Sequence, residues 1–227
     1  MGADIVICPR VTDASVTMGA AAWKFNWQRD DYDALAGSLA AGHIIECGAQ
    51  TTGGNYSFFE EVPTFKNIGY PIAEIEEDGS FTITKHPDTG GLVSIGTVTA
   101  QLLYEISAPE YLNPDVIAHF DTLKMKQVSD DRVRITGCKG SSPPSTHKVC
   151  INLAGGYRNG MELILTGLDI EEKAKILSEA LFDLLGGKEQ FDDVTVELHR
   201  QEKETPQSNE EAMTSLRINV TSNDPNK

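Results

Sequence analysis

The stretch FTITKHPDTGG, residues 81–91, places an alternating apolar and polar run directly before a loop of small residues. The alternation over 81–85 predicts a β-strand, and Gly79 supplies the turn that leads into it. Apolar residues at helical spacing after the loop predict a helix over about 97–106. A strand, a glycine-rich loop and a helix in this order are typical of folds that combine helices with sheets.

Other glycine-rich loops, strands and helices surround this stretch. The loop TTGGN, residues 51–55, directly follows a predicted helix that Asp30 or Asp31 can cap and that runs to about Glu46. A further helix is predicted from Asp169 to the glycines at 186–187. Sequence patterns also predict strands at 4–8, 147–153, 161–165, 194–198 and 216–220, a β-hairpin over 122–136 and a short helical turn at 113–115.

We therefore expect an α/β or α+β fold with a mixed β-sheet flanked by helices. The first predicted strand begins close to Met1 and the last ends at Thr221, so both ends of the sheet lack a neighbouring element. From this we expect an incomplete domain, in which residues 1–227 form an internal part of a single larger domain. A subdivision is expected near 140–146, where serine and proline cluster.

Charge and composition narrow the class of protein. The net charge is −15, with 34 acidic against 19 basic residues, which disfavours a nucleic acid as partner because phosphates are bound by basic surfaces. No apolar run approaches the roughly 20 residues that span a bilayer, and the N-terminus lacks the basic region of a signal peptide. The cysteines at 8, 47, 138 and 150 show no CxxC spacing. We expect a cytoplasmic protein without a metal site, and no cofactor is identified.

The two glycine-rich loops are candidate binding elements for an anionic or acyl ligand. Glycine lets backbone N–H groups approach a ligand closely, and successive N–H groups can hold a negative charge. The alternative is that these glycines only make tight connections between strand and helix. The spacing of Gly91 and Gly96 resembles a P-loop, but Thr97 stands where that motif needs lysine, so a nucleotide is disfavoured. The loop residues expected to bind are Gly53, Gly54, Asn55, Thr89, Gly90 and Gly91.

Four further side chains are candidates for chemistry. Arg10 and Asp13 follow the first predicted strand, where an arginine can hold a carboxylate and an aspartate can act as a general base. His86 opens the second loop and is the other candidate for proton transfer. Cys47 is a possible nucleophile with His86 as its base, provided that its pKa is lowered. The alternatives are a turn stabilised by Asp13 and a cysteine that only packs.

With these segments located, the chain resembles the acyclic terpene utilisation (AtuA-like) family. The resemblance covers nearly the whole chain in the right order. The matching segments are ADIVIC (3–8), RVTDAS (10–15), AAGHIIEC (40–47), TGGN (52–55), KHPDTGG (85–91), GTVTAQLLYEI (96–106), YLNPD (111–115) and TGLD (166–169).

The resemblance implies a role in the catabolism of branched isoprenoids such as citronellol and geraniol, whose intermediates travel as acyl-CoA thioesters. It also implies a lyase or hydratase-like step on a branched acyl-CoA, which would be the small-molecule substrate. Members of the family extend further on both sides, including a glycine-rich N-terminal region. The expected partners are therefore this substrate and either a second copy or another chain that completes the domain, with no nucleic acid and no membrane. Non-catalytic binding or assembly, or a fragment without independent function, are the alternatives.

Overall fold

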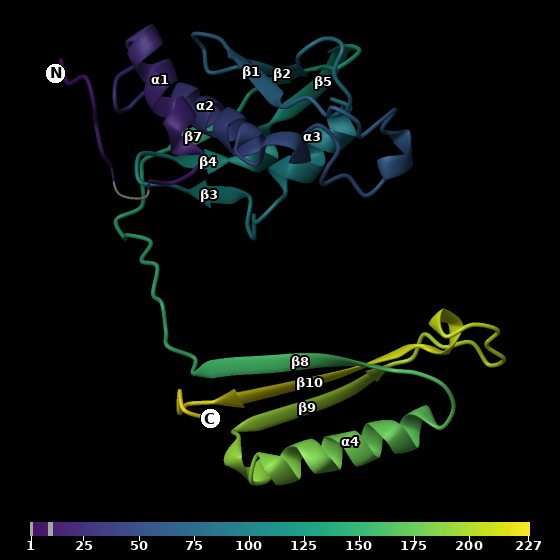
Figure 1. The fold of residues 1–227 in the computed structure, drawn as a ribbon. Coiled ribbons are helices and arrows are strands. Elements are labelled where there is room, and N and C mark those ends of the chain that lie inside the picture. Colours follow the sequence, from purple (N-terminus) through teal and green to yellow (C-terminus); the bar gives the residue numbers. More distant parts are fainter. Residues whose placement is uncertain (1, 9–10) are drawn as a thin grey trace. The chain divides into compact units, whose positions relative to one another are not determined.

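The computed structural model describes residues 2–8 and 11–227, and the chain divides into two compact units, Met1–Lys148 and Val149–Lys227 (Figure 1). Each unit has its own cluster of buried apolar side chains. The candidate residues from the sequence all belong to the first unit.

The first unit combines three helices with two antiparallel sheets among its described residues. One sheet has the strand order β1-β2-β6-β5 and the other has the order β3-β4-β7. The helices are α1 (Ser15–Phe25), α2 (Tyr32–Ile45) and α3 (Ile95–Leu102). The strands are β1 (Pro71–Ile75), β2 (Phe81–Lys85), β3 (Glu110–Leu112), β4 (Ile117–His119), β5 (Lys124–Ser129), β6 (Arg132–Thr136) and β7 (Lys139–Ser141).

Helix α2 is the centre of the first unit, and every residue from Leu35 to Ile44 is buried. A helix buried on all sides must be apolar or small around its whole circumference, and the segment LAGSLAAGHI meets this requirement except at His43. Its glycines admit close neighbours: a Cβ on Gly37 would lie 2.1 Å from the Gly79 carbonyl oxygen, and one on Gly42 would lie 2.1 Å from that of Ala14. These contacts fix α1 and the β1–β2 turn against α2.

The second unit is a three-stranded antiparallel sheet with one helix on one face (Figure 1). Its strands β8 (Tyr157–Leu165), β10 (Thr214–Ser222) and β9 (Asp193–His199) pair in that order, and the helix is α4 (Ile170–Leu184). Side chains from both layers form the core, including Leu165, Ile170, Ala174, Phe182, Leu216 and Ile218. Among the described residues, no helix is both long and apolar enough to cross a bilayer.

The predicted class is confirmed, since helices and sheets share the chain. The structure also confirms α2, the strand at 81–85, the hairpin of β5 and β6, and the last helix with its end at Gly186. All pairings between named strands are antiparallel, so three separate sheets in the described part of the chain replace the single mixed one. A single parallel bridge joins Ile68 and Gly90.

Three predicted elements are wrong. Residues 4–8 form no strand, and Ile5 and Ile7 are 83% and 93% exposed, because no other described strand pairs with this segment. Residues 147–153 are likewise extended without partners, with Leu153 87% exposed. Residues 113–115 form the turn between β3 and β4, where the Asn113 N–H donates to the Val116 carbonyl. Apolar alternation predicts strand propensity, but a strand also needs a hydrogen-bonding partner.

Candidate active site

The two glycine-rich loops lie against each other. The Leu92 N–H donates to the Thr52 carbonyl over 2.9 Å, and a Cβ on Gly91 would lie 2.7 Å from the same oxygen. Thr52 itself is buried, and its hydroxyl donates to the Gly69 carbonyl over 2.5 Å. The loops therefore form one packed assembly with the segment around Gly69.

Most of the backbone donors that the sequence predicts for a ligand are already hydrogen-bonded. The N–H groups of the four candidate glycines and of Asn55 each donate to a backbone carbonyl of the same unit. The pairs are Gly53 to Gln50 (3.2 Å), Gly54 to Ala49 (3.0 Å), Asn55 to Gln50 (3.2 Å), Gly90 to Asn67 (2.9 Å) and Gly91 to Thr64 (2.8 Å). In this conformation the glycines serve close packing, and an anion would have to displace these bonds.

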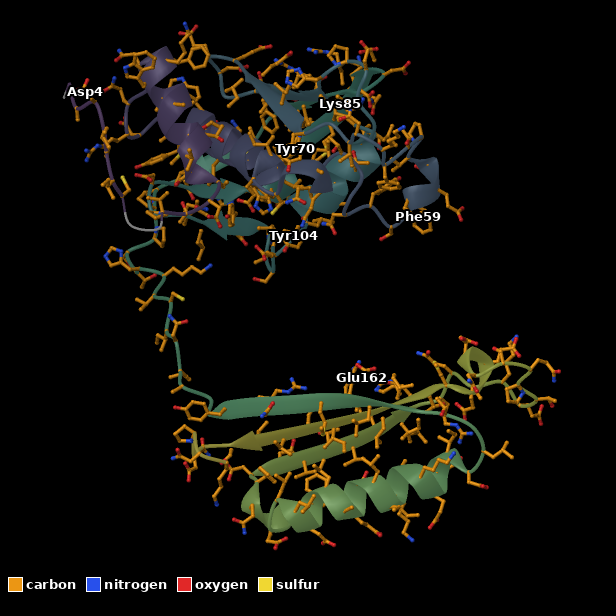
Figure 2. All side chains as sticks on the ribbon, in the orientation of Figure 1. Asp4, Phe59, Tyr70, Lys85, Tyr104 and Glu162 are labelled. Atoms are coloured by element: carbon orange, nitrogen blue, oxygen red, sulfur yellow. The ribbon has the colours of Figure 1, made fainter. Side chains whose placement is uncertain are left out.

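His86 lies on the exposed part of the second loop. The Thr89 hydroxyl donates to the His86 carbonyl over 2.7 Å, and Lys85 donates to the Thr89 carbonyl over 2.9 Å. The Lys85 side chain is 6% exposed and pairs with Asp131 at 3.1 Å. This half-buried ion pair connects the loop to the β5–β6 turn, and Figure 2 labels Lys85 at the end of β2.

Arg10 lies outside the described residues. Asp13 is exposed just before α1, and its carboxylate acts electrostatically on Glu46, Cys47 and Tyr111. The structure thus brings Asp13 and Cys47 to one place. The groups that perturb the Cys47 thiol are Glu46, Gln101, Glu105 and Asp13, and His86 is not among them.

A buried polar cluster occupies the C-terminal end of α2. The His43 Nδ1 lies 3.4 Å from the Glu46 Oε1, and the two side chains are only 2% and 12% exposed. The His43 ring also contacts Tyr111 and Phe120, with ring centroids 5.1 and 5.8 Å apart. Tyr70, labelled in Figure 2, lies against Gly48, since a Cβ on that glycine would be 3.3 Å from the Tyr70 ring.

Several polar side-chain atoms in and beside this cluster are buried and make no well-formed hydrogen bond among the described residues. They are Oγ1 of Thr12, both ring nitrogens of His43, Oε2 of Glu46, Oε1 of Gln50, both amide atoms of Gln101 and Nδ2 of Asn113. Buried polar groups in folded proteins are almost always paired. Such a concentration of unpaired donors and acceptors at one helix end is typical of a place where water or a ligand completes the bonding.

The environment shifts the titration of the cluster. Burial, reinforced by the Asp13 and Glu105 carboxylates, raises the pKa of Glu46 to about 7. Burial also lowers the pKa of His43, although nearby backbone carbonyls and Glu105 act in the opposite direction. A neutral imidazole therefore lies beside a carboxyl group that exchanges its proton near pH 7. This is the condition that a general acid–base pair requires.

The surroundings of the Cys47 thiol favour its protonated form, which is not the nucleophilic form. Burial and the Glu46 carboxylate raise its pKa, while the nearby Gln101 amide acts the other way. A nucleophilic cysteine needs a lowered pKa. In this conformation Cys47 is a protonated thiol at the edge of the cluster.

From the sequence, His43 is predicted only to cap or pack the helix, and Glu46 is not predicted to take part in chemistry. The signal was present in AAGHIIECGAQ, residues 40–50, where both polar residues interrupt an otherwise apolar helix. Their spacing of three residues places them on one helix face. What the sequence could not supply was the second half of the cluster, which comes from residues before α1, from the end of α3 and from β3.

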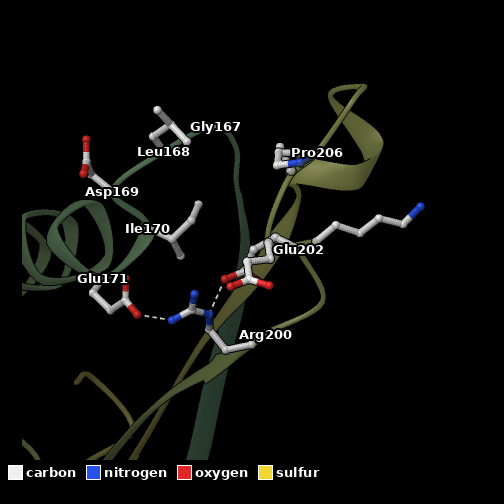
Figure 3. A pocket seen from close by; sticks show the side chains of 11 residues that line it. Gly167, Leu168, Asp169, Ile170, Glu171, Arg200, Glu202 and Pro206 are labelled. Carbon is white, nitrogen blue, oxygen red and sulfur yellow. Dashed lines mark hydrogen bonds and ion pairs between the residues drawn. The ribbon is translucent and has the colours of Figure 1, made fainter.

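Two pockets on the described surface lie elsewhere, and neither is lined by a nominated residue. One, of about 620 Å³ in the first unit, is lined by Trp27, Tyr32 and several acidic residues. The other, of about 570 Å³ in the second unit, contains Arg200 (Figure 3). That guanidinium already pairs with Glu171 and Glu202, so it presents no unpaired charge to a ligand.

Among the described residues no group of acidic, histidine or cysteine side chains could hold a metal ion. The fold and the cluster define an α/β protein with a buried histidine–glutamate pair in its first unit. A model of the family described as "Acyclic terpene utilisation family protein AtuA" matches residues 1–227, and the chain belongs to this family. No curated protein and no solved structure matches the chain.

Proposed function

We propose that the first unit carries a proton-transfer site for a branched acyl-CoA thioester of acyclic terpenoid catabolism. Family membership supports a role in acyclic terpene utilisation. The observation that carries the chemical part of the proposal is the set of unpaired buried polar atoms around Glu46 and His43. Glu46 would exchange a proton with a carbon next to the thioester carbonyl, and His43 would orient the carboxyl group.

The charge of the site favours an uncharged reacting group. The Asp13 and Glu105 carboxylates both act on Glu46 at the end of α2, so an anionic group entering there would be repelled. A thioester carbonyl and its neighbouring carbons carry no charge. The phosphates of coenzyme A would then stay outside the cluster, while the acyl part enters it.

Solvent-exchange measurements test the proposal without requiring the complete reaction to be known. The full chain is incubated in D₂O with a branched isoprenoid acyl-CoA, and deuterium in the acyl group is followed by mass spectrometry. Exchange is expected with the native protein. It should fall about 100-fold or more in Glu46→Gln, because the general base is then lost.

Two further variants test whether Glu46 or His86 transfers the proton. Glu60→Gln changes an exposed carboxylate in the loop 56–61 and should leave exchange unchanged. His86→Ala tests the histidine that the sequence nominates for proton transfer. Loss of exchange in His86→Ala with normal exchange in Glu46→Gln would refute the role of Glu46 and support that of His86.

A non-catalytic binding or assembly role is the second candidate. It is favoured by the glycine-rich loops, in which the N–H groups of all four candidate glycines donate to backbone carbonyls of the same unit. In that case no deuterium exchange occurs with any acyl-CoA. Binding without chemistry would still raise the melting temperature, since a ligand at about 100 times its Kd adds about 2.7 kcal/mol of stability.

A further inference from the structure

Strand β8 is a long edge strand. It has nine residues, Tyr157–Leu165, and pairs along its whole length with β10. On its other side no strand pairs with it among the described residues. An edge of this length exposes a row of backbone donors and acceptors that can pair with another chain.

The side chains of β8 alternate between the two faces of the sheet. Leu163 and Leu165 belong to the core beneath α4. Arg158 and Glu162 lie on the opposite face and are exposed, and Figure 2 shows Glu162 on the side of the sheet away from α4. Hydrogen bonding by Ser215 and the charge of Arg217 lower the pKa of Glu162, which keeps it ionised at neutral pH.

The sequence of β8 is self-complementary about Gly160. If two copies align antiparallel with Gly160 opposite Gly160, then Arg158 of each copy faces Glu162 of the other, because both residues are two positions from the centre. On the core face the same register sets Tyr157 opposite Leu163, and Asn159 opposite Met161. We propose that two copies of this chain pair through β8 in this register and form one continuous six-stranded sheet.

The backbone at the centre fits this pairing. The Gly160 N–H donates to the side-chain oxygen of its own neighbour Asn159 over 2.9 Å and is therefore not used in the ladder to β10. It can donate to the Gly160 carbonyl of a second copy when the Asn159 side chain moves aside. The two-fold axis of the dimer passes between the two copies of Gly160. Because glycine has no side chain, no two side chains clash there.

Other edge strands fit self-pairing less well. Strand β5 carries Lys124 and Lys126, which would face each other as like charges when two copies align about Met125. Strand β1 begins with Pro71, which has no N–H to donate. Strand β9 contains two acidic residues, Asp193 and Glu197, without an arginine or lysine. Charge complementarity therefore singles out β8 among these edges.

Charge reversal on the full chain tests the register. Sedimentation velocity over a wide concentration range should show a dimer for the native protein. In each of the variants Arg158→Glu and Glu162→Arg, residues 158 and 162 of facing copies carry the same charge at both places in the dimer. Each variant should therefore weaken self-association about tenfold or more. Mixing these two variants should restore a heterodimer, since every pair at 158 and 162 is then again of opposite charge.

The control is Lys175→Glu, which makes the same type of change on the exposed side of α4 and should leave the dimer intact. Circular dichroism of each variant establishes that the fold is retained, which matters most for Glu162→Arg because Arg217 lies nearby. A native protein that remains monomeric would overturn the proposal. A dimer that survives Arg158→Glu, or variants that do not associate when mixed, would overturn the register.

Discussion

Glu46 shows how one buried carboxyl group can be costly for stability and useful for chemistry. It is 12% exposed and shares its surroundings with two further carboxylates. Its pKa of about 7 means that the fold favours the protonated form. Ionisation above that pH therefore costs free energy in the folded state but not in the unfolded chain.

Glu46→Gln should stabilise the protein in a pH-dependent way. The folded pKa of about 7 lies above the ordinary value of 4.5, so the native protein loses stability as the pH rises between these values. The amide does not ionise and escapes this loss. The variant should match the native protein near pH 4.5 and exceed it by about 1–3 kcal/mol above pH 7. Melting temperatures across this range measure the difference.

Glu74→Gln is the matched control, because Arg132 hydrogen-bonds Glu74 and lowers its pKa. Its contribution to stability has the opposite sign: it is present at neutral pH and is lost as the pH falls through the folded pKa. The control should therefore be slightly less stable than the native protein at pH 7. A Glu46→Gln variant that behaves like the control would show that Glu46 is not destabilised by its burial.

The sequence predicted candidate residues one by one, and the structure shows which of them lie together. It placed Cys47 and Asp13 in the site, and the structure brings both to the end of α2. The sequence pointed to His86 or Asp13 as the residue that transfers a proton, because those residues border apolar segments or loops. Burial is what distinguishes Glu46 and His43, and burial depends on which elements pack around the helix end, which a single sequence does not specify.

Helix α2 is the element on which the first unit depends. Its small residues let α1 and the β1–β2 turn approach at backbone distance, so the helix is held by close contact as well as by apolar area. Gly42 lies at one of these contacts, next to the Ala14 carbonyl. The α1–α2 contact in turn holds Asp13 near Glu46, since Asp13 directly precedes Ala14.

Gly42→Ala should be strongly destabilising. The new Cβ would lie 2.1 Å from the Ala14 carbonyl oxygen, so α1 must shift. We expect a loss of about 3 kcal/mol or more in the free energy of unfolding, measured by denaturant titration. Gly19→Ala is the matched control, since Gly19 lies inside α1 and a Cβ there would meet nothing within 4 Å. It should stabilise by about 0.5–1 kcal/mol, and an equal loss in both variants would contradict this account.

Elements with a strong local signal were predictable from the sequence. The small and apolar residues of α2, the turn between β5 and β6, and the glycines after α4 all specify structure within a few residues. The predicted cap is not made: Asp31 stands at the N-cap of α2, but its carboxylate accepts from the Gln28 N–H instead of from the helix. The segments 4–8 and 147–153 have equally strong β patterns but no strand partner among the described residues. A strand forms only when a second strand is available to hydrogen-bond with it. The sequence pattern of one segment therefore predicts its β propensity but not whether it finds a partner.

At the scale of the whole molecule, the two units have separate hydrophobic cores. Ile83 is fully buried in the first, and Leu216 is almost fully buried in the second. Both tryptophans of the chain, Trp23 and Trp27, lie in the first unit. Trp27 packs against its core and donates to the Glu77 carbonyl over 2.8 Å. Tryptophan fluorescence therefore reports on the first unit, whereas circular dichroism reports on both.

Leu216→Ala should lower the melting transition of the second unit without moving the fluorescence transition. Truncating a buried leucine costs about 2–5 kcal/mol, which corresponds to about 10 °C or more for a unit of this size. Circular dichroism should show the shift in part of its amplitude, whereas Ile83→Ala should move the fluorescence transition. If Leu216→Ala shifts the fluorescence midpoint as far as the circular dichroism, the units unfold as one cooperative structure. Separate transitions would instead mean that the first unit alone maintains the geometry of the Glu46 site.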